Sequence, residues 1–215
     1  MKITGFGAGP FQTNCYVIIN DTATGCPAFV VDPSLGAYER VCELVAKEGA
    51  TLEAVLLTHG HIDHTRDAGA FGLPTYIHPA DAFMLEAGEG VTERLRLPFD
   101  VESMTRVEEV VDVHDGEEIV LAGIELLPRH APGHSPGSTL FIGEGFVLAG
   151  DVIFRGSIGR TDLPYSDDAA MGDSLRGPVW DLPDEAAILP GHGPTTQMGY
   201  ERRTNPYLRA ANTGR

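Results

Sequence analysis

The chain has 215 residues, a formal net charge of -16 and a sequence pI near 4.7. This length suits one well-cored domain, so we expect residues 1–215 to form a single domain. The negative charge argues against binding of nucleic acid or anionic lipid, because both would be repelled. No apolar run is long enough to span a membrane and the N-terminus lacks a signal-peptide pattern, so neither membrane insertion nor export is expected.

Short apolar strands alternate with a few helical patterns along the chain. In chain order we expect strands at 15–19, 27–32, 53–58, 75–79, 107–113, 117–123, 124–128, 138–143, 146–151 and 186–191, bounded by Gly, Pro and Asp. Helical spacing favours a helix at 38–49, a second at 79–88 and a third, from a less regular pattern, at 167–175. Strands mixed with helices indicate a layered α/β protein.

Cysteine usage indicates a reducing environment. Cys15, Cys26 and Cys42 are odd in number and form no CxxC pair, which argues against a disulfide framework or a zinc ribbon. We interpret them as buried or bystander thiols of a cytoplasmic protein. No interface signal in the sequence assigns an oligomeric state.

The segment "LTHGHIDHTRD" at 57–67 places His59, His61, Asp63 and His64 within six residues. Solvated histidines rarely concentrate so densely, so the segment predicts a metal site. An apolar run precedes the histidines and a glycine interrupts them, which favours a strand-end loop over a helix through His59 and His61. In an extended loop the two-residue period would turn the first three of these side chains to one side and His64 toward a neighbouring position.

Three later segments repeat this design, in which an apolar strand ends at a side chain that can bind metal. The strands end at His134, Asp151 and His192, and each of these residues follows a glycine suited to a tight turn, namely Gly133, Gly150 and Gly191. Convergence of the strand ends would build one accurately positioned pocket that substrate can reach. The remaining histidines lack such support and are interpreted as structural or solvated: His78, His114 and His130.

The motifs "THGHIDH", "APGHSPGS", "FVLAGD" and "LPGHGP", in this order, resemble those of the metallo-β-lactamase superfamily. The resemblance implies an αββα sandwich, two mixed β-sheets flanked by helices, with the site at one edge. It assigns His59, His61 and His134 to a first metal, Asp63, His64 and His192 to a second, and Asp151 to the bridge between them. Two divalent ions are therefore expected, zinc by preference and iron or manganese as alternatives, because no cysteine ligand narrows the choice.

Within this superfamily, "DVIFRGSIGRTDLP" and "ERRTNPYLR" most resemble short, single-domain members of the glyoxalase II (hydroxyacylglutathione hydrolase) group. These enzymes hydrolyse S-acyl thioesters such as S-lactoylglutathione, by a metal-bridging hydroxide that attacks the carbonyl. The resemblance implies catalytic roles for Asp63 and Asp151. Arg160 would bind a substrate carboxylate, with an ion pair to Asp162 as an equal structural alternative. Since 23 residues follow His192, no separate C-terminal helical domain is expected.

Other functions are weighed against this hydrolase. The "RGSIGRTD" segment also resembles persulfide dioxygenases, in which one Fe(II) would be held by His59, His134 and Asp151. The hydrolase is preferred because "PGHGPTT" and "ERRTNPYL" are closer to the glyoxalase II group. A nuclease is disfavoured by the acidic chain, and a β-lactamase by the closer likeness to the thioesterases. A metal-holding protein without turnover is a third class, disfavoured because no ligand position is degraded.

Overall fold

In the computed structural model, which describes residues 1–23, 25–86 and 91–213, two six-stranded sheets lie face to face. The first sheet has the order β1-β2-β3-β4-β5-β6. The strands are β1 (Lys2–Ala8), β2 (Thr13–Ile19), β3 (Pro27–Val31), β4 (Thr51–Leu56), β5 (Thr75–Ile77) and β6 (Val110–Asp112). The β1-β2 and β2-β3 pairs are antiparallel and the pairs from β3 to β6 are parallel, so this sheet is mixed.

The second sheet has the order β14-β13-β10-β9-β8-β7. The strands are β7 (Ile119–Leu121), β8 (Ile124–His130), β9 (Thr139–Gly143), β10 (Phe146–Gly150), β13 (Ala187–Pro190) and β14 (Thr196–Gln197). Only the β10-β13 pair is parallel, so this sheet is mixed as well. A small hairpin of β11 (Ile153–Phe154) and β12 (Ser157–Ile158) follows β10.

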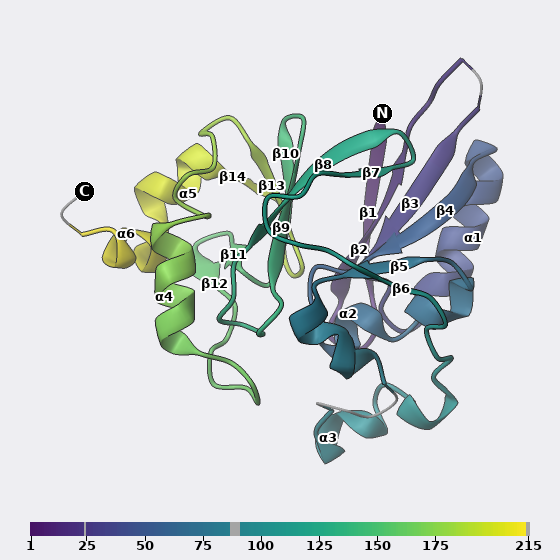
Figure 1. The fold of residues 1–215 in the computed structure, drawn as a ribbon, viewed down its shortest axis with the longest axis horizontal. Helices are drawn as coiled ribbons and strands as arrows, with labels where there is room; N and C mark the ends of the chain where they lie inside the picture. Colours follow the sequence, from purple (N-terminus) through teal and green to yellow (C-terminus); the bar gives the residue numbers. More distant parts are fainter. Residues whose placement is uncertain (24, 87–90, 214–215) are drawn as a thin grey trace.

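Helices cover the outer faces of both sheets and complete the sandwich (Figure 1). Helix α1 (Ala37–Glu48) flanks the first sheet, and α4 (Asp168–Arg176), α5 (Met198–Thr204) and α6 (Pro206–Ala211) flank the second. Short helices occupy the connections: α2 (Ile62–Thr65), α3 (Glu93–Arg96) and the 3-10 helices η1 (Ala68–Phe71), η2 (Pro79–Leu85) and η3 (Val101–Ser103). The predicted αββα architecture is therefore confirmed. Among the described residues, none of these helices has the length and apolarity needed to cross a bilayer.

Both faces of the central strands are buried, which explains why these strands read as continuous apolar runs. Between the sheets, Phe29 and Leu56 of the first pack with Phe141 and Leu148 of the second. On the opposite face of the first sheet, alternate side chains such as Val30 pack with α1. A further cluster joins the second sheet to α4, α5 and α6.

Several elements differ from the sequence expectations. The helix expected at 79–88 is the 3-10 helix η2, which ends at Leu85, and the rest of that range lies partly outside the described residues. Strand β1 was missed because Gly5 and Gly7 lower its β propensity. Helices α5 and α6 were missed because each is short and is stabilised mainly by burial of residues such as Met198 and Leu208 against the second sheet.

Replacing Phe141 with Ala should destabilise the protein by about 3–5 kcal/mol, because its fully buried ring fills the space between the two sheets. Denaturant unfolding of the purified variant measures this loss. Val120→Ala, at an exposed position of β7, serves as the control and should change stability by less than about 0.5 kcal/mol. Equal, small losses for both variants would contradict the inter-sheet core.

Candidate metal centre

The four strand ends predicted to carry ligands meet at one edge of the sandwich, and backbone hydrogen bonds join their loops. The Thr139 N–H donates to the Thr58 carbonyl (3.0 Å), which links the loop after β4 to the second sheet. The Gly191 N–H donates to the Gly150 carbonyl (2.7 Å), which links the ends of β13 and β10. These hydrogen bonds help to fix the relative positions of the loops that carry the predicted ligands.

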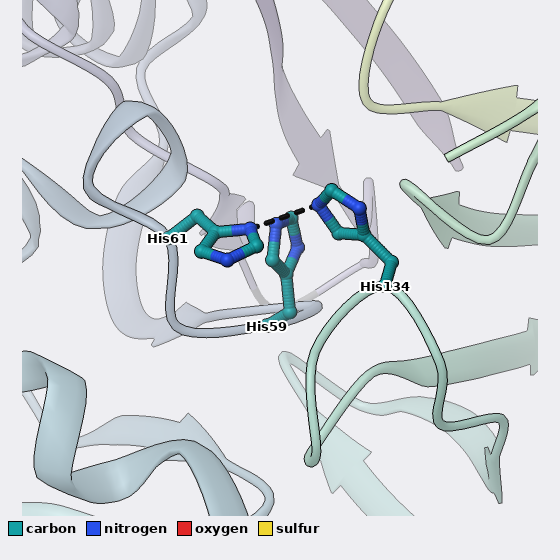
Figure 2. A group of neighbouring side chains, drawn as sticks. All are labelled: His59, His61 and His134. Carbon is teal, nitrogen blue, oxygen red and sulfur yellow. Dashed lines mark hydrogen bonds between the residues drawn. The ribbon is translucent and has the colours of Figure 1, made fainter. Parts of the chain in front are cut away.

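His59, His61 and His134 form the first group, and their rings point toward one another from two different loops (Figure 2). His61 Nδ1 lies 2.8 Å from His134 Nε2, and the ring centroids of His59 and His134 are 4.9 Å apart. One nitrogen from each ring lies within 4.8 Å of the other two. This arrangement can hold one metal ion.

Asp63, His64 and His192 form a second group beside the first. His192 Nε2 lies 3.1 Å from Asp63 Oδ2, and His64 Nε2 lies 3.5 Å from the same oxygen. The chain turns into α2 at Ile62, so a helical turn positions Asp63 and His64. The expectation of an extended chain through Asp63 is therefore wrong, although His59 and His61 do precede the helix.

Asp151 lies between the two groups. Its Oδ2 is 3.4 Å from His134 Nε2 and 3.5 Å from His192 Nε2, and its Oδ1 is 3.4 Å from His64 Nε2. Both groups therefore contact the same carboxylate, which is the position expected of a bridging ligand. With Asp151, all seven predicted ligand residues lie together.

The hydrogen bonding of the histidine rings fits metal binding. The Nδ1 atoms of His59, His64 and His134 lie 3.1, 2.9 and 2.8 Å from Thr58 Oγ1, Asp32 Oδ2 and the Arg160 carbonyl. Donation from Nδ1 leaves the Nε2 lone pair free for a metal. Within the described part of the chain, three buried atoms at this site have no hydrogen-bond partner, namely His59 Nε2, His64 Nε2 and Asp151 Oδ1. Buried polar atoms are rarely left unpaired, so these residues fit a bound cation.

The electrostatics of the rings also suit cations. Burial and the neighbouring histidines hold the pKa of His59 well below its usual value, and burial with His134 lowers the pKa of His61 to about 4. Both rings are therefore neutral, which is the ligand form. Burial also disfavours charge on His64, but the surrounding carboxylates outweigh it and raise the pKa of His64 well above its usual value. Without a metal, the His64 ring would therefore be protonated, and a bound cation would displace that proton.

Asp32, which sequence reasoning missed, orients two of the histidines. The Thr58 N–H donates to Asp32 Oδ1 (2.8 Å), and the Thr58 hydroxyl donates to Asp32 Oδ2 (2.6 Å), the oxygen that also contacts His64 Nδ1. Through Thr58 the carboxylate also fixes the position of His59. The signal was present in the sequence, because "PAFVVD" is another apolar strand that ends at an aspartate.

Asp81, also missed, joins the two loops that carry the first group. Its fully buried carboxylate accepts hydrogen bonds from the Gly60 N–H (2.8 Å), the Ser135 hydroxyl (2.6 Å) and the Gly137 N–H (2.6 Å). Gly60 lies between His59 and His61, and Ser135 follows His134. No sequence signal indicated this role, because Asp81 lies in a segment that was read only as a helix.

The glycines before the later ligands allow close packing at the site. Gly150 has a φ of 46°, a conformation that L side chains rarely adopt, and a Cβ there would collide with Thr58. A Cβ at Gly191 would collide with the Asp151 carboxylate and the His64 ring. The expected tight turns are thus required by neighbouring side chains as well as by the backbone.

A pocket of about 700 Å³ opens onto the two groups and includes Arg160 in its wall. Arg160 Nε and Nη2 donate to the two carboxylate oxygens of Asp162, at 2.8 and 2.9 Å. The structure thus contains the Arg160–Asp162 ion pair, at an exposed position where it contributes little to stability. His78 and His130 stack on each other with centroids 4.1 Å apart, and neither belongs to a candidate metal group among the described residues.

Replacing Asp32 with Asn should weaken metal binding by about 10- to 100-fold, because an amide cannot accept hydrogen bonds at both positions and its NH₂ would face His64 or Thr58. Competition with a chromogenic chelator measures the affinity. Asp115→Asn is the matched control, since Asp115 is exposed and contacts Arg129 and His130 instead. Equal affinities for the two variants would remove the orienting role of Asp32.

Comparisons with known proteins agree with this geometry. An uncharacterized protein of Mycobacterium tuberculosis is 39% identical over 221 residues, covering 97% of this chain and 98% of the relative. The hydroxyacylglutathione hydrolase GloC of Haemophilus influenzae is 34% identical over 205 residues, covering 92% of this chain and 93% of that protein.

Among solved structures, the BLEG-1 B3 metallo-beta-lactamase has a TM-score of 0.84 at 31% identity, covering 96% of this chain and 99% of that one. TTHA1623 in a di-iron-bound form has a TM-score of 0.73 at 34% identity, covering 95% and 99%. Residues 8–192 match the sequence model of the metallo-beta-lactamase superfamily, and the chain therefore belongs to that superfamily.

Proposed function

We propose that this protein is a metal-dependent hydrolase of the glyoxalase II type, which cleaves S-acyl thioesters such as S-lactoylglutathione or a related thiol conjugate. The observation that carries the proposal is the pair of adjacent ligand groups, joined by Asp151, at the base of a pocket of about 700 Å³. A pocket of this volume accommodates a small-molecule substrate. The likeness to a protein named hydroxyacylglutathione hydrolase supports the choice of thioesters.

The proposed cofactor is a pair of divalent ions, zinc by preference, with iron or manganese as alternatives. The ligand residues are His59, His61, Asp63, His64, His134, Asp151 and His192. When bound, the ions would supply hydroxide near neutral pH and polarise the thioester carbonyl. Imidazole and carboxylate donors suit all three metals, and the similar structure described as di-iron-bound supports keeping iron among them.

The residues of this chain would position the reactants. The Thr13 hydroxyl donates to Asp63 Oδ2 (3.1 Å), so the carboxylate is held in a fixed orientation from which it can align the attacking water. Arg160 lies in the pocket wall and is proposed to contact a substrate carboxylate, in exchange for part of its exposed pairing with Asp162. The leaving thiolate needs little help, because its conjugate thiol is more acidic than an alcohol or an amine.

The proposed setting is the cytoplasm, with a small molecule as the partner. All three cysteines, Cys15, Cys26 and Cys42, are free thiols, which supports a reducing compartment. The net charge of -16 supports a partner other than nucleic acid or an anionic membrane.

Reconstituted protein should contain about two metal ions per chain and should hydrolyse S-lactoylglutathione or a simple S-acyl thioester in the absence of oxygen. Elemental analysis gives the metal content, and release of thiol under argon gives the rate. One iron per chain, with oxygen consumption in the presence of glutathione persulfide, would instead establish the dioxygenase alternative.

Replacing Asp151 with Ala should remove most of the bound metal and lower activity by about a hundredfold or more, because both groups of ligands contact this carboxylate. Metal content and thioester hydrolysis are measured on the same preparation. Asp115→Ala, an exposed change remote from the site, should retain both. Normal metal content in Asp151→Ala would show that the bridging assignment is wrong.

A further inference from the structure

A large part of the pocket wall away from the metal ligands is apolar. It includes the side chains of Phe11, Met84, Val91, Leu95 and Leu163. A lactoyl group carries only one methyl group and one hydroxyl group, both on the carbon next to its carbonyl, so it would leave most of this surface in contact with water. The composition of the wall therefore suits a larger apolar group than the acyl group of S-lactoylglutathione.

This wall is supported from behind by its own small core. Ile62, Phe99 and Val101 are buried together, and Val91 and Leu95 pack against them. The Phe11 ring contacts the Phe99 ring edge-on, with centroids 5.2 Å apart. The apolar surface is thus preformed, so a ligand would not need to order it.

Arg66 connects the wall to the metal centre. Its buried guanidinium donates from Nε to the Phe99 carbonyl (2.6 Å), and from Nη2 to the Asp100 carbonyl (2.9 Å) and the Ser103 hydroxyl (2.8 Å). Arg66 directly follows α2, which carries Asp63. The segment 57–67 therefore carries four of the proposed ligands and, through Arg66, also holds in place the 99–103 segment, which includes part of the small core behind the wall.

The charges around the wall are balanced. Glu93 and Arg94 are neighbours that both line the pocket, and Arg160 is paired with Asp162. Apart from the metal centre, the described residues that line the pocket therefore carry no surplus of positive charge that would favour a multiply charged carrier over an apolar chain.

We propose that Phe11, Met84, Val91 and Leu95 form a subsite for an apolar chain attached to the thioester, so that the substrates are thioesters bearing a chain of several carbons. This inference rests on the proposed hydrolase function. The chain can belong to the acyl group or to the thiol, because the wall recognises the same chemistry in both.

Two substrate series test the subsite and identify which side carries the chain. In the first, acetyl, butanoyl and hexanoyl thioesters share N-acetylcysteamine as the thiol; in the second, acetyl thioesters carry alkanethiols of increasing length. We expect kcat/KM to rise about threefold to fourfold per methylene in one series. A flat response in both series, with hydrolysis retained, would overturn the subsite but leave the hydrolase function intact.

Binding provides a readout that does not depend on turnover. A hexyl thioether of N-acetylcysteamine cannot be hydrolysed as a thioester, and calorimetry should show it binding about tenfold or more tightly than the methyl thioether. If no thioester is hydrolysed but this preference is seen, the proposed function fails and the subsite stands. Equal binding of the two thioethers would overturn the subsite.

Variants of the wall locate the effect. Phe11→Ala and Leu95→Ala should each lower kcat/KM for the preferred long-chain substrate about tenfold, with the acetyl substrate changed by less than about twofold. Leu97→Ala is the matched control, because Leu97 closely follows Leu95 but is 89% exposed and lies outside the pocket. Phe11 is 50% exposed, so its removal should spare the fold even if Leu95→Ala is unstable, and melting curves check this. Identical effects of Phe11→Ala and Leu97→Ala would overturn the assignment.

Discussion

The hydrogen bonds accepted by the Asp32 carboxylate are the constraint on which the metal centre depends. Burying a carboxylate is costly unless it is paired and hydrogen-bonded, and Asp32 meets this requirement through Thr58 and His64. The same contacts fix which nitrogen of His64 faces the site. Because Asp32 directly follows β3, a central strand of the first sheet, its position, and with it the orientation of His64 and His59, depends on the packing of the sandwich.

Asp81 is a second buried carboxylate that holds the candidate ligands in position, and its hydrogen bonds reach loops of both sheets. Its carboxylate accepts N–H groups from the loop after β4 and from the loop after β8, which belong to different sheets. The relative position of His59 and His134 therefore depends on a side chain that belongs to neither ligand group. Two divalent ions would more than neutralise the negative charges of the Asp63 and Asp151 carboxylates. Together with one hydroxide, the two ions and the two carboxylates would carry a net charge of about +1.

The sequence was sufficient to predict the layered α/β class and the seven residues that the structure brings together as candidate ligands, because a metal site requires specific side-chain types and buried strands require apolar runs. It was insufficient for contacts between distant segments. Asp81 was read as part of a helix, and its partners lie 21 to 56 residues away. Arg66 belongs to the histidine-rich segment but contacts the Phe99 carbonyl, 33 residues later, so its role is visible only in the folded chain.

The candidate metal ligands and the apolar wall of the pocket come largely from different parts of the chain. The proposed ligands lie in loops that follow strand ends of both sheets, whereas Val91 and Leu95 of the apolar wall, and most of the small core behind them, come from the connection between η2 and β6. Two residues of the histidine-rich segment connect the ligand loops to the wall. Ile62, in α2, packs with the core behind the wall, and Arg66, directly after α2, donates to the Phe99 carbonyl. Changes in the 91–103 connection can therefore alter the shape and polarity of the wall without moving a strand end. A change of substrate would then require new wall residues but no change in the candidate ligands, which is physically simpler than rebuilding the ligands for each substrate.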